Sequence, residues 1–412
     1  MKVWLVSTFE PIPSDNMRPM RFAGITDRLL ANGHQVVTWT GSFRHSDRKQ
    51  RFDRDDRSQA GPDHEVITLK SWSYSTNISF RRMFAHGHLA RRLTDQFVKE
   101  PKPDVILVAT PPVSVAAAAV DYGEKHDVPV VADVIDPWPD AVYSYLPRRL
   151  RPFAKLALVP MNRDARRLFS RCAGITAISQ QYVDWARAKG GHRCSVGGAI
   201  FPGADLAGFD ERMKSVGGRK KNGQEGPLRF VYAGALGTAY DVETIISAAR
   251  LLEKQGVTDM EFLIAGGGPR REEFERLAAG MPQVRFLGML DATELARTYS
   301  TSDAGIACYR KGATQSIPYK LFDYLAVGMP IISSLTGEME EIITRERVGM
   351  HYEPENPEAL AKCLRQLACD REAMREMGAR GRAFTELHGD NAKNYETMVG
   401  MLSSVAGLRP VQ

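Results

Sequence analysis

The sequence of 412 residues has few cysteines and no long apolar run. Its five cysteines are scattered, and Cys363 and Cys369 are too far apart to form a CxxC pair. An odd cysteine count in a chain of this size favours reduced cytosolic thiols over a disulfide framework or a zinc site. No apolar stretch approaches the roughly 18 residues of a membrane span. The opening MKVWLVSTFEP predicts a strand and a loop rather than a signal peptide.

Two nucleotide-binding motifs are also absent. The chain contains no GKS or GKT, which argues against a P-loop nucleotidase. Neither glycine turn of the C-terminal half reads GxGxxG, and no acidic residue stands out about 20 residues after either turn. A nicotinamide cofactor is therefore not favoured, and we expect no cofactor.

The charge balance points to an anionic partner. The formal net charge is +6, which suits nucleic acid, a phosphorylated small molecule or a membrane surface. No recognised nucleic-acid-binding fold accompanies the charge, so nucleic acid is not expected. Residues 80–92 and 146–171 mix basic and apolar side chains, which suits an anionic membrane surface. A solvated helix face is an equally good interpretation of both segments.

Both halves of the chain alternate apolar strands with helices. In the first half we expect strands at 2–7, 35–40, 65–69, 105–109, 128–134 and 174–178, and helices at 18–31, 80–99, 113–126, 151–170 and 180–189. In the second half strands are expected at the segments LRFVYAG, MEFLIAG, QVRFLG, AGIACY, PIISS and VGMHYE, with helices at 241–255, 269–280, 291–302, 318–327 and 338–344. Apolar strands separated by helices predict parallel sheets covered on both faces. The fold class is therefore α/β, with two doubly wound Rossmann-like domains facing across a cleft.

The domain boundaries follow from a break in this rhythm. Residues 207–227 are polar, glycine-rich and without periodicity, which is typical of a linker or surface loop. We therefore expect one domain at 1–205, a linker at 206–227 and a second domain at 228–387. The tail at 357–405 is largely helical in pattern, and residues 388–412 are the last segment of the chain.

The segment 315–341 carries the most specific signal. Ser316 or Ile317 can start a helix, Pro318 suits its first turn, and Gly328 ends it. Lys320 and Asp323 then lie near the positive end of the helix. The lysine and the backbone amides near Ser316–Tyr319 can hold a diphosphate, and the aspartate can hold a sugar hydroxyl. A solvated lysine is the alternative for Lys320.

Two glycine turns each follow a strand and open a helix. Gly234 and Gly237 belong to the first, and Gly267 and Gly268 to the second. Glycines there let backbone amides approach an anion. Tight turns also favour glycine without any ligand, and for each turn alone that is the stronger interpretation.

Four further residues are candidates in the N-terminal half. Asp136 follows a buried strand, so it is expected at the cleft, where it can orient a sugar hydroxyl; Asp140, close by, equally suits a helix cap. Arg18 and Arg21 are three apart on one helix face and can hold an acceptor phosphate, although a surface pair is as plausible. His45 is the remaining acceptor candidate, and a solvated loop histidine is the simpler interpretation.

Taken in order, several segments resemble family 4 glycosyltransferases of the GT-B fold. The matching segments are YAGALG, FLIAGGGPRREEFERLA, VRFLGML, SDAGIACY, SIPYKLFDYLAVGMPII, GEMEEII and VGMHYEPENPEALA in the C-terminal half, and MRFAGITDRLLANGHQVVTWT and VVADVIDPWPDA in the N-terminal half. The last of these is similar to the variant that builds bacterial surface polysaccharides. The resemblance covers nearly the whole chain.

This resemblance implies a retaining, metal-free transfer from a nucleotide sugar, with UDP-sugar as the expected donor. The donor would bind the C-terminal domain, with backbone contacts to the base near Leu287, and the acceptor would bind the N-terminal domain. Residues 388–412 would form a helix that crosses back to the first domain.

Several positions depart from the family pattern. Its two glutamates fall on Gln315 and Asp323, which would touch the donor sugar and the ribose. Its diphosphate-binding arginine and lysine fall on the uncharged Ala235 and Tyr240. Lys320, with the amides of Ser316 and Tyr319, is then the first candidate to balance the leaving group.

The expected function is transfer of a sugar to a polyprenyl-diphosphate-linked or other surface-glycan precursor. The protein would be cytoplasmic and peripheral at the inner face of the membrane. A nucleotide-sugar 2-epimerase on the same fold and a non-catalytic partner subunit remain alternatives.

Overall fold

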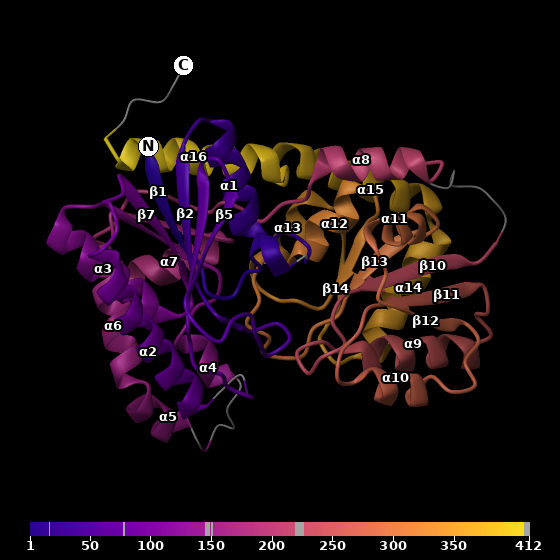
Figure 1. The fold of residues 1–412 in the computed structure, drawn as a ribbon. Coiled ribbons are helices and arrows are strands. Elements are labelled where there is room, and N and C mark those ends of the chain that lie inside the picture. The colour runs from indigo at the N-terminus through magenta and orange to yellow at the C-terminus, as the bar shows by residue number, and fades with distance from the viewer. Residues whose placement is uncertain (16, 77–78, 145–148, 150, 219–225, 408–412) are drawn as a thin grey trace. The chain divides into compact units, whose positions relative to one another are not determined.

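The computed structural model describes residues 1–412 apart from 16, 77–78, 145–148, 150, 219–225 and 408–412 (Figure 1). The chain divides into two compact units, each built on its own sheet. Unit 1 is Met1–Phe201 with Ala392–Gln412, and unit 2 is Pro202–Asn391. The predicted α/β fold with two Rossmann-like sheets is confirmed.

Unit 1 contains a seven-stranded sheet in the order β5-β6-β2-β1-β7-β8-β9. All neighbouring strands are parallel except β5 and β6, which are antiparallel. The strands are β1 (Lys2–Val6), β2 (Gln35–Gly41), β5 (Asp56–Gly61), β6 (His64–Leu69), β7 (Val105–Thr110), β8 (Val130–Val134) and β9 (Gly174–Ala177). A small separate ribbon pairs β3 (Phe43–Arg44) with β4 (Lys49–Gln50).

Helices cover both faces of this sheet because successive strand residues point to opposite sides. Trp4 and Val6 of β1 pack into one core, and Val3 and Leu5 pack into the other. The first core is closed by α2 (Phe80–Phe97), α3 (Val113–His126), α6 (Val159–Arg171) and α7 (Gln180–Lys189). The second is closed by α1 (Arg21–Ala31) and α16 (Asn391–Val405). The short helices α4 (Asp140–Ser144) and α5 (Arg151–Ala157) complete the unit.

Unit 2 contains a six-stranded parallel sheet in the order β12-β11-β10-β13-β14-β15. Its strands are β10 (Leu228–Ala233), β11 (Met260–Ala265), β12 (Val284–Gly288), β13 (Ala304–Ala307), β14 (Ile331–Ser333) and β15 (Gly349–His351). Its helices are α8 (Leu206–Ser215), α9 (Val242–Lys254), α10 (Arg271–Leu277), α11 (Ala292–Ser300), α12 (Tyr319–Ala326), α13 (Glu338–Glu346), α14 (Pro357–Cys369) and α15 (Arg371–His388).

The linker prediction is wrong for residues 206–215, which form α8. Asp205 caps this helix by accepting the Gly208 N–H at 3.0 Å. Leu206 and Phe209 are buried, and the Phe209 ring stacks on Tyr299 of α11 at 6.5 Å. Two apolar residues in a polar segment were too weak a signal for a helix. Residues 219–225 of the predicted linker lie outside the described residues.

Three further expectations need correction. The helix expected at 151–170 ends at Ala157 and restarts at Val159, because Pro160 in the first turn of α6 lacks an N–H for a continuous helix. The helix expected at 18–31 starts at Arg21, so Arg18 lies outside it. Strand β5 was not expected, because its residues are polar and mostly exposed.

The last helix of the chain packs on unit 1, beside α1 in Figure 1. Met398 and Leu402 are fully buried in its core. Gly24 of α1 lies so close to Tyr395 that an added Cβ would stand 2.3 Å from the ring. Asn32 on α1 also donates to the Glu396 carboxylate at 3.1 Å. The first unit is therefore completed by residues that follow the whole of the second.

We expect Leu402→Ala to lower the free energy of unfolding by about 2–5 kcal/mol, because the buried leucine leaves a cavity against the sheet. Chemical unfolding followed by circular dichroism measures the change. Ser404→Ala, an exposed position on the same helix, is the control and should change little. Equal, small effects of both variants would mean that α16 does not complete this core.

Candidate active site

The carboxyl edge of the unit 2 sheet holds the donor-side candidates. Strand order reverses between β10 and β13, and ligands of doubly wound sheets bind where such a reversal opens a crevice. The turn after β10 contains Gly234, and the loop after β13 leads into α12 with Lys320. The sequence therefore places its most specific segment at the position in the fold that most often binds a ligand.

Lys320 is the second residue of α12 and extends into a group of tyrosine rings. Its Nζ lies 3.9 Å from the ring centroid of Tyr232, 4.3 Å from that of Tyr240 and 5.7 Å from that of Tyr309. The Nζ atom is buried and has no hydrogen-bond partner among the described residues. A solvated lysine, the alternative considered above, is therefore wrong. The ammonium is held by cation–π contacts and lacks the acceptors that a charged amine normally has.

Burial also changes the proton affinity of this lysine. Desolvation lowers the pKa of Lys320 to about 8, and the neighbouring Cys308 and Asp323 only partly oppose that shift. At neutral pH the side chain remains charged. An anion that reached it would meet an ammonium with three free N–H donors and little water to compete with.

Glycines in the two turns allow close contacts that a Cβ atom would prevent. A Cβ on Gly234 would stand 2.7 Å from Lys320 Nζ, so glycine is required for the lysine to reach this position. The Leu236 carbonyl would stand 2.4 Å from a Cβ on Gly268, which explains that glycine by loop packing. Gly237 faces open space, and Gly267 faces Met289 at 3.3 Å. Of the four predicted residues, Gly234 is the one that lies against the buried cation.

The remaining donor-side candidates surround the start of α12. Pro318 is the N-cap residue, so the helix begins at Tyr319, and Ser316 is fully buried before it. The Gln315 Oε1 atom is buried without a hydrogen-bond partner in the described part of the chain. Asp323 is 5% exposed on the same helix as Lys320. Leu287, half-buried in β12, is the candidate furthest along the edge of the sheet from α12.

In unit 1 the structure corrects the role expected for Arg21. This side chain is 1% exposed and forms a bidentate ion pair with Asp133, at 2.7 and 2.9 Å. It also donates to the Ile200 carbonyl at 2.7 Å, while Thr176 donates to Asp133 at 2.7 Å. Arg21 is therefore an internal anchor between α1 and the sheet. It does not form a surface pair with Arg18, which is exposed before the helix begins.

His45 is not the solvated loop histidine that was the simpler interpretation. Its ring lies 3.0 Å from the Tyr74 hydroxyl and packs against Phe9 at 5.0 Å. Burial lowers the pKa of His45 to about 4, assisted by the positive charges of Arg82 and Arg48. The imidazole is therefore neutral near pH 7 and offers no positive charge to an acceptor phosphate.

The carboxylates of unit 1 have separate roles. Asp136 follows β8 at the carboxyl edge, and burial raises its pKa to about 6 while Arg82 opposes the shift. Asp140 is not a cap, because its oxygens accept from Lys189 at 2.9 Å and from the Trp185 indole at 2.8 Å. Glu10 accepts the Phe22 N–H at 2.6 Å, and burial raises its pKa to about 7. Asp136 remains the catalytic candidate of this unit.

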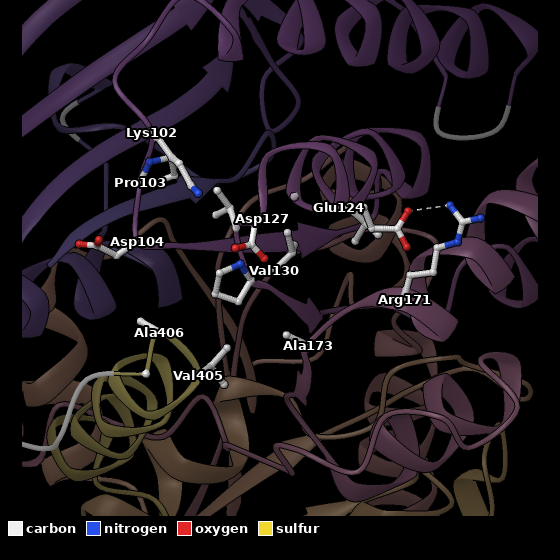
Figure 2. A pocket seen from close by; sticks show the side chains of 15 residues that line it. Lys102, Pro103, Asp104, Glu124, Asp127, Val130, Arg171, Ala173, Val405 and Ala406 are labelled. Carbon is white, nitrogen blue, oxygen red and sulfur yellow. Dashed lines mark hydrogen bonds and ion pairs between the residues drawn. The ribbon is translucent and has the colours of Figure 1, made fainter.

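A hollow of about 600 Å³ in unit 1 lies away from these residues. Figure 2 shows Lys102, Asp127 and the ion pair of Glu124 with Arg171, whose atoms approach to 3.0 Å, around it. These residues precede β7, β8 and β9, so the hollow opens at the amino ends of the strands. Ligands of this fold bind at the opposite edge, and none of the predicted site residues lines the hollow.

Two kinds of feature are absent from the described residues. No group of three or more histidine, cysteine, aspartate or glutamate side chains is arranged to hold a metal ion. Among the same residues, no helix combines the length and the apolar character that crossing a bilayer requires.

The sequence did not predict that three tyrosine rings surround Lys320. Tyr232 and Tyr309 stand at or just after the ends of β10 and β13, and Tyr240 lies in the loop that precedes α9. An aromatic residue at the carboxyl end of a buried strand was the available signal. Their spacing along the chain gave no sign that the three rings meet one ammonium.

Two family models match successive parts of this chain. Residues 22–197 match the model described as Glycosyltransferase Family 4, and residues 227–370 match the one described as Glycosyl transferases group 1. The two matches together cover most of both units. The two Rossmann-like sheets, with candidate residues at their carboxyl edges, define a GT-B fold. The chain belongs to the family 4 glycosyltransferases.

Curated relatives are similar at moderate identity. The sulfoquinovosyl transferase SQD2 of Arabidopsis thaliana is 25% identical over 69% of this chain and 54% of its own length. A GDP-mannose-dependent alpha-(1-6)-phosphatidylinositol dimannoside mannosyltransferase of Mycobacterium tuberculosis is 30% identical over 44% of this chain and 46% of its own. The matches therefore span about half the length of these relatives.

Solved structures share the fold at low identity. Sucrose-phosphate synthase from Thermosynechococcus elongatus superposes with a TM-score of 0.73 at 14% identity, covering 98% of this chain and 99% of that one. HepE from Anabaena, solved with UDP, gives a TM-score of 0.67 at 12% identity, with the same coverage. At these identities the likeness establishes the architecture alone.

The pKa of Lys320 predicts a rise in stability with pH. Between about pH 8 and the ordinary lysine value of 10.5, an unfolded chain holds a proton at this residue that the native chain has released. The free energy of unfolding should then rise by roughly 2 kcal/mol from about pH 8 to 9.5, relative to Lys320→Met. Urea unfolding across this range measures the difference. Parallel curves for the two proteins would contradict the buried ammonium.

Proposed function

We propose that this chain is a retaining glycosyltransferase that moves a sugar from a nucleotide-sugar donor, with UDP-sugar preferred, to a lipid-linked or other surface-glycan precursor. The reaction would need neither a metal nor a cofactor. Transfer would take place at the cytoplasmic face of a bacterial membrane and contribute to polysaccharide biosynthesis.

The buried ammonium of Lys320 is the observation that carries this proposal. Retaining transfer requires the nucleoside diphosphate to leave as the acceptor attacks from the same face, so most of the developing charge is on the diphosphate. Positions 235 and 240, where the family's cations fall, hold alanine and tyrosine here. Lys320 Nζ lies against the Tyr240 ring and beside Gly234. A cation from α12 therefore reaches the turn from which the usual cations are missing.

The other donor contacts extend along the same edge. The amides of Ser316 and Tyr319, beside Pro318, would face the phosphates, and Asp323 would accept the ribose hydroxyls with a shorter reach than glutamate. Gln315 would meet the donor sugar, since its buried Oε1 lacks a donor partner among the described residues. A sugar hydroxyl would satisfy that atom, which is costly to leave unpaired.

The acceptor side relies on Asp136. Because its pKa is about 6, this carboxylate is ionised near pH 7 and can accept a hydrogen bond from an acceptor hydroxyl. Arg18, exposed before α1, would contribute a positive charge to an acceptor phosphate.

The names of the relatives support a nucleotide-sugar donor and a lipid-linked acceptor. HepE was solved with UDP, and the mycobacterial relative is named for GDP-mannose and a phosphatidylinositol mannoside. The first supports a UDP-sugar donor and the second a lipid-linked acceptor. Because the names differ in the base, both UDP-sugars and GDP-sugars belong in any donor screen.

Replacing Lys320 with alanine should lower kcat/KM for sugar transfer by roughly 10²-fold or more, because the leaving diphosphate loses its main cation. Donor hydrolysis or transfer, followed by release of the nucleoside diphosphate, measures the rate. Lys311→Ala removes an exposed lysine from the loop before α12 and serves as the matched control. A near-normal rate for Lys320→Ala would remove this role.

Two further measurements separate the alternative functions. An isomer formed from the nucleotide sugar alone would show a 2-epimerase, and no thermal shift with any UDP, GDP, TDP or CMP sugar would favour a non-catalytic subunit. Activity should persist in a chelator, and rescue by Mg²⁺ or Mn²⁺ would contradict a metal-free reaction.

The membrane part of the proposal is supported by exposed apolar side chains next to basic ones. Phe80 and Phe84 lie four residues apart on α2, and each is 67% exposed. Phe153 and Leu156 on α5 are 74% and 76% exposed, with the basic Lys155 between them. Such a mixture suits insertion into an anionic bilayer surface. Residues 146–148 and 150 of the predicted basic segment lie outside the described residues.

We expect Phe153→Ser with Leu156→Ser to weaken binding to phosphatidylglycerol-containing vesicles by roughly tenfold or more, because two large apolar side chains leave the interface. Vesicle sedimentation measures the bound fraction. Leu387→Ser, at an exposed leucine of α15 that is 72% accessible, is the matched control. Equal binding by the double variant and the control would contradict this surface.

A further inference from the structure

Arg82 is a buried arginine surrounded by aromatic rings at the carboxyl edge of unit 1. The side chain belongs to α2 and is 5% exposed. Its guanidinium carbon lies 4.5 Å from the ring centroid of Trp138, 5.2 Å from that of Phe9 and 5.5 Å from that of Tyr74. Cation–π contacts of this kind are stronger when the cation is desolvated. The proposed reaction has so far given this residue no role.

The three rings come from three different loops. Phe9 follows β1, Tyr74 follows β6, and Trp138 follows β8. Parallel strands end at the same edge of the sheet, so these loops together form the floor of any acceptor site in the unit. The Arg82 guanidinium therefore contacts three loops that follow three different strands.

The Trp138 contact bears directly on Asp136. The Trp138 N–H donates to the Asp136 carbonyl at 2.9 Å, so the two residues belong to one tight turn. The Asp136 N–H in turn faces the Thr110 carbonyl, at 3.5 Å, at the end of β7. Fixing the indole therefore fixes the backbone from which the candidate carboxylate projects.

Arg82 is also the cation that acts on the surrounding titratable groups. Burial raises the pKa of Asp136 and Arg82 opposes that rise. Burial and Arg82 together lower the pKa of His45 to about 4 and that of His86, on α2, to about 3. Tyr74 is shifted upward by burial, and Arg82 and Arg48 oppose the shift. Both histidines are thus neutral, and among the described residues Arg82 is the positive charge that acts on Asp136.

We propose that Arg82 is a positioning residue of the transfer reaction, which holds the Asp136 loop through Trp138 and supplies the positive charge that keeps this carboxylate ionised to accept the acceptor hydroxyl. The inference rests on the proposed function, since Asp136 must act on the acceptor. Arg82 itself touches neither substrate. Its effect is exerted through the position and the charge state of its neighbour.

The experiment compares Arg82→Gln, Arg82→Lys and Asp136→Asn with wild type. Arg82→Gln should lower kcat/KM for the acceptor by roughly tenfold to a hundredfold, because the carboxylate is misplaced. Loss of the cation raises the pKa of Asp136, so the acid limb of the pH profile should move to higher pH. Arg82→Lys keeps the charge and should leave the limb in place while recovering part of the rate.

Two controls isolate the acceptor side. Lys99→Gln removes one positive charge from the exposed residue just beyond α2 and should leave the rate and the profile unchanged. Nucleoside-diphosphate affinity should be the same in all variants, because the donor residues belong to unit 2. If Arg82→Gln does not fold, as judged by circular dichroism, Arg82→Lys and Trp138→Phe provide the comparison, and both should raise the acceptor KM.

Three outcomes would overturn the inference. A slow Arg82→Gln enzyme whose acid limb stays in place would show a purely structural role. An unchanged acid limb in the residual activity of Asp136→Asn would assign that limb to another group, such as His45 or His86. If Asp136→Asn is slow but Arg82→Gln matches wild type, Arg82 has no part in positioning. Full activity of Asp136→Asn would instead remove the acceptor role of Asp136 from the proposed function.

Discussion

A positive charge buried without a hydrogen-bond acceptor from the described residues is the constraint on which the donor side depends. An ammonium taken out of water loses its hydration, and aromatic faces return only part of that free energy. Lys320 is in this position, with tyrosine rings on several sides and a glycine backbone below it. The native chain therefore carries an unfavourable charge that a bound anion would relieve. The cost to stability and the readiness to bind a diphosphate have the same physical origin.

The buried arginines of unit 1 have different surroundings from Lys320. The guanidinium of Arg21 is matched by a bidentate carboxylate, a geometry in which removing one partner strands the other in the interior. Arg82 is instead surrounded by rings and acts on groups that titrate near or below neutral pH. A fully paired arginine stabilises one arrangement of α1 on the sheet. Arg82 packs instead against three rings, beside a carboxylate that the proposed reaction uses.

Elements that depend on a local residue pattern could be predicted from the sequence. Contacts between residues far apart in the chain could not. Continuous apolar runs such as Val105–Thr110 identified the central strands, and glycine and proline placed the start and end of α12 well. The exposed strand β5 and the helix α8 have little apolar content, so neither was expected. Arg21 and His45 looked like surface residues because nothing in their neighbours along the chain reveals burial. The tyrosine rings around Lys320 meet only after the sheet forms, and the arginine on α2 gave no sign of the rings it would contact.

The placement of α16 has a consequence for how this chain is made. Unit 1 needs the apolar face of that helix to close its second core, yet a ribosome delivers the helix only after all of unit 2 has emerged. Until then Val3, Leu5 and their neighbours are covered by α1 but not by α16, while the second unit is synthesised and folds. An expression fragment that stops near residue 201 would keep that apolar surface exposed for good. Residues 202–391 would instead form a fragment that matches one packed unit. The boundaries of the units therefore do not coincide with a single cut in the sequence.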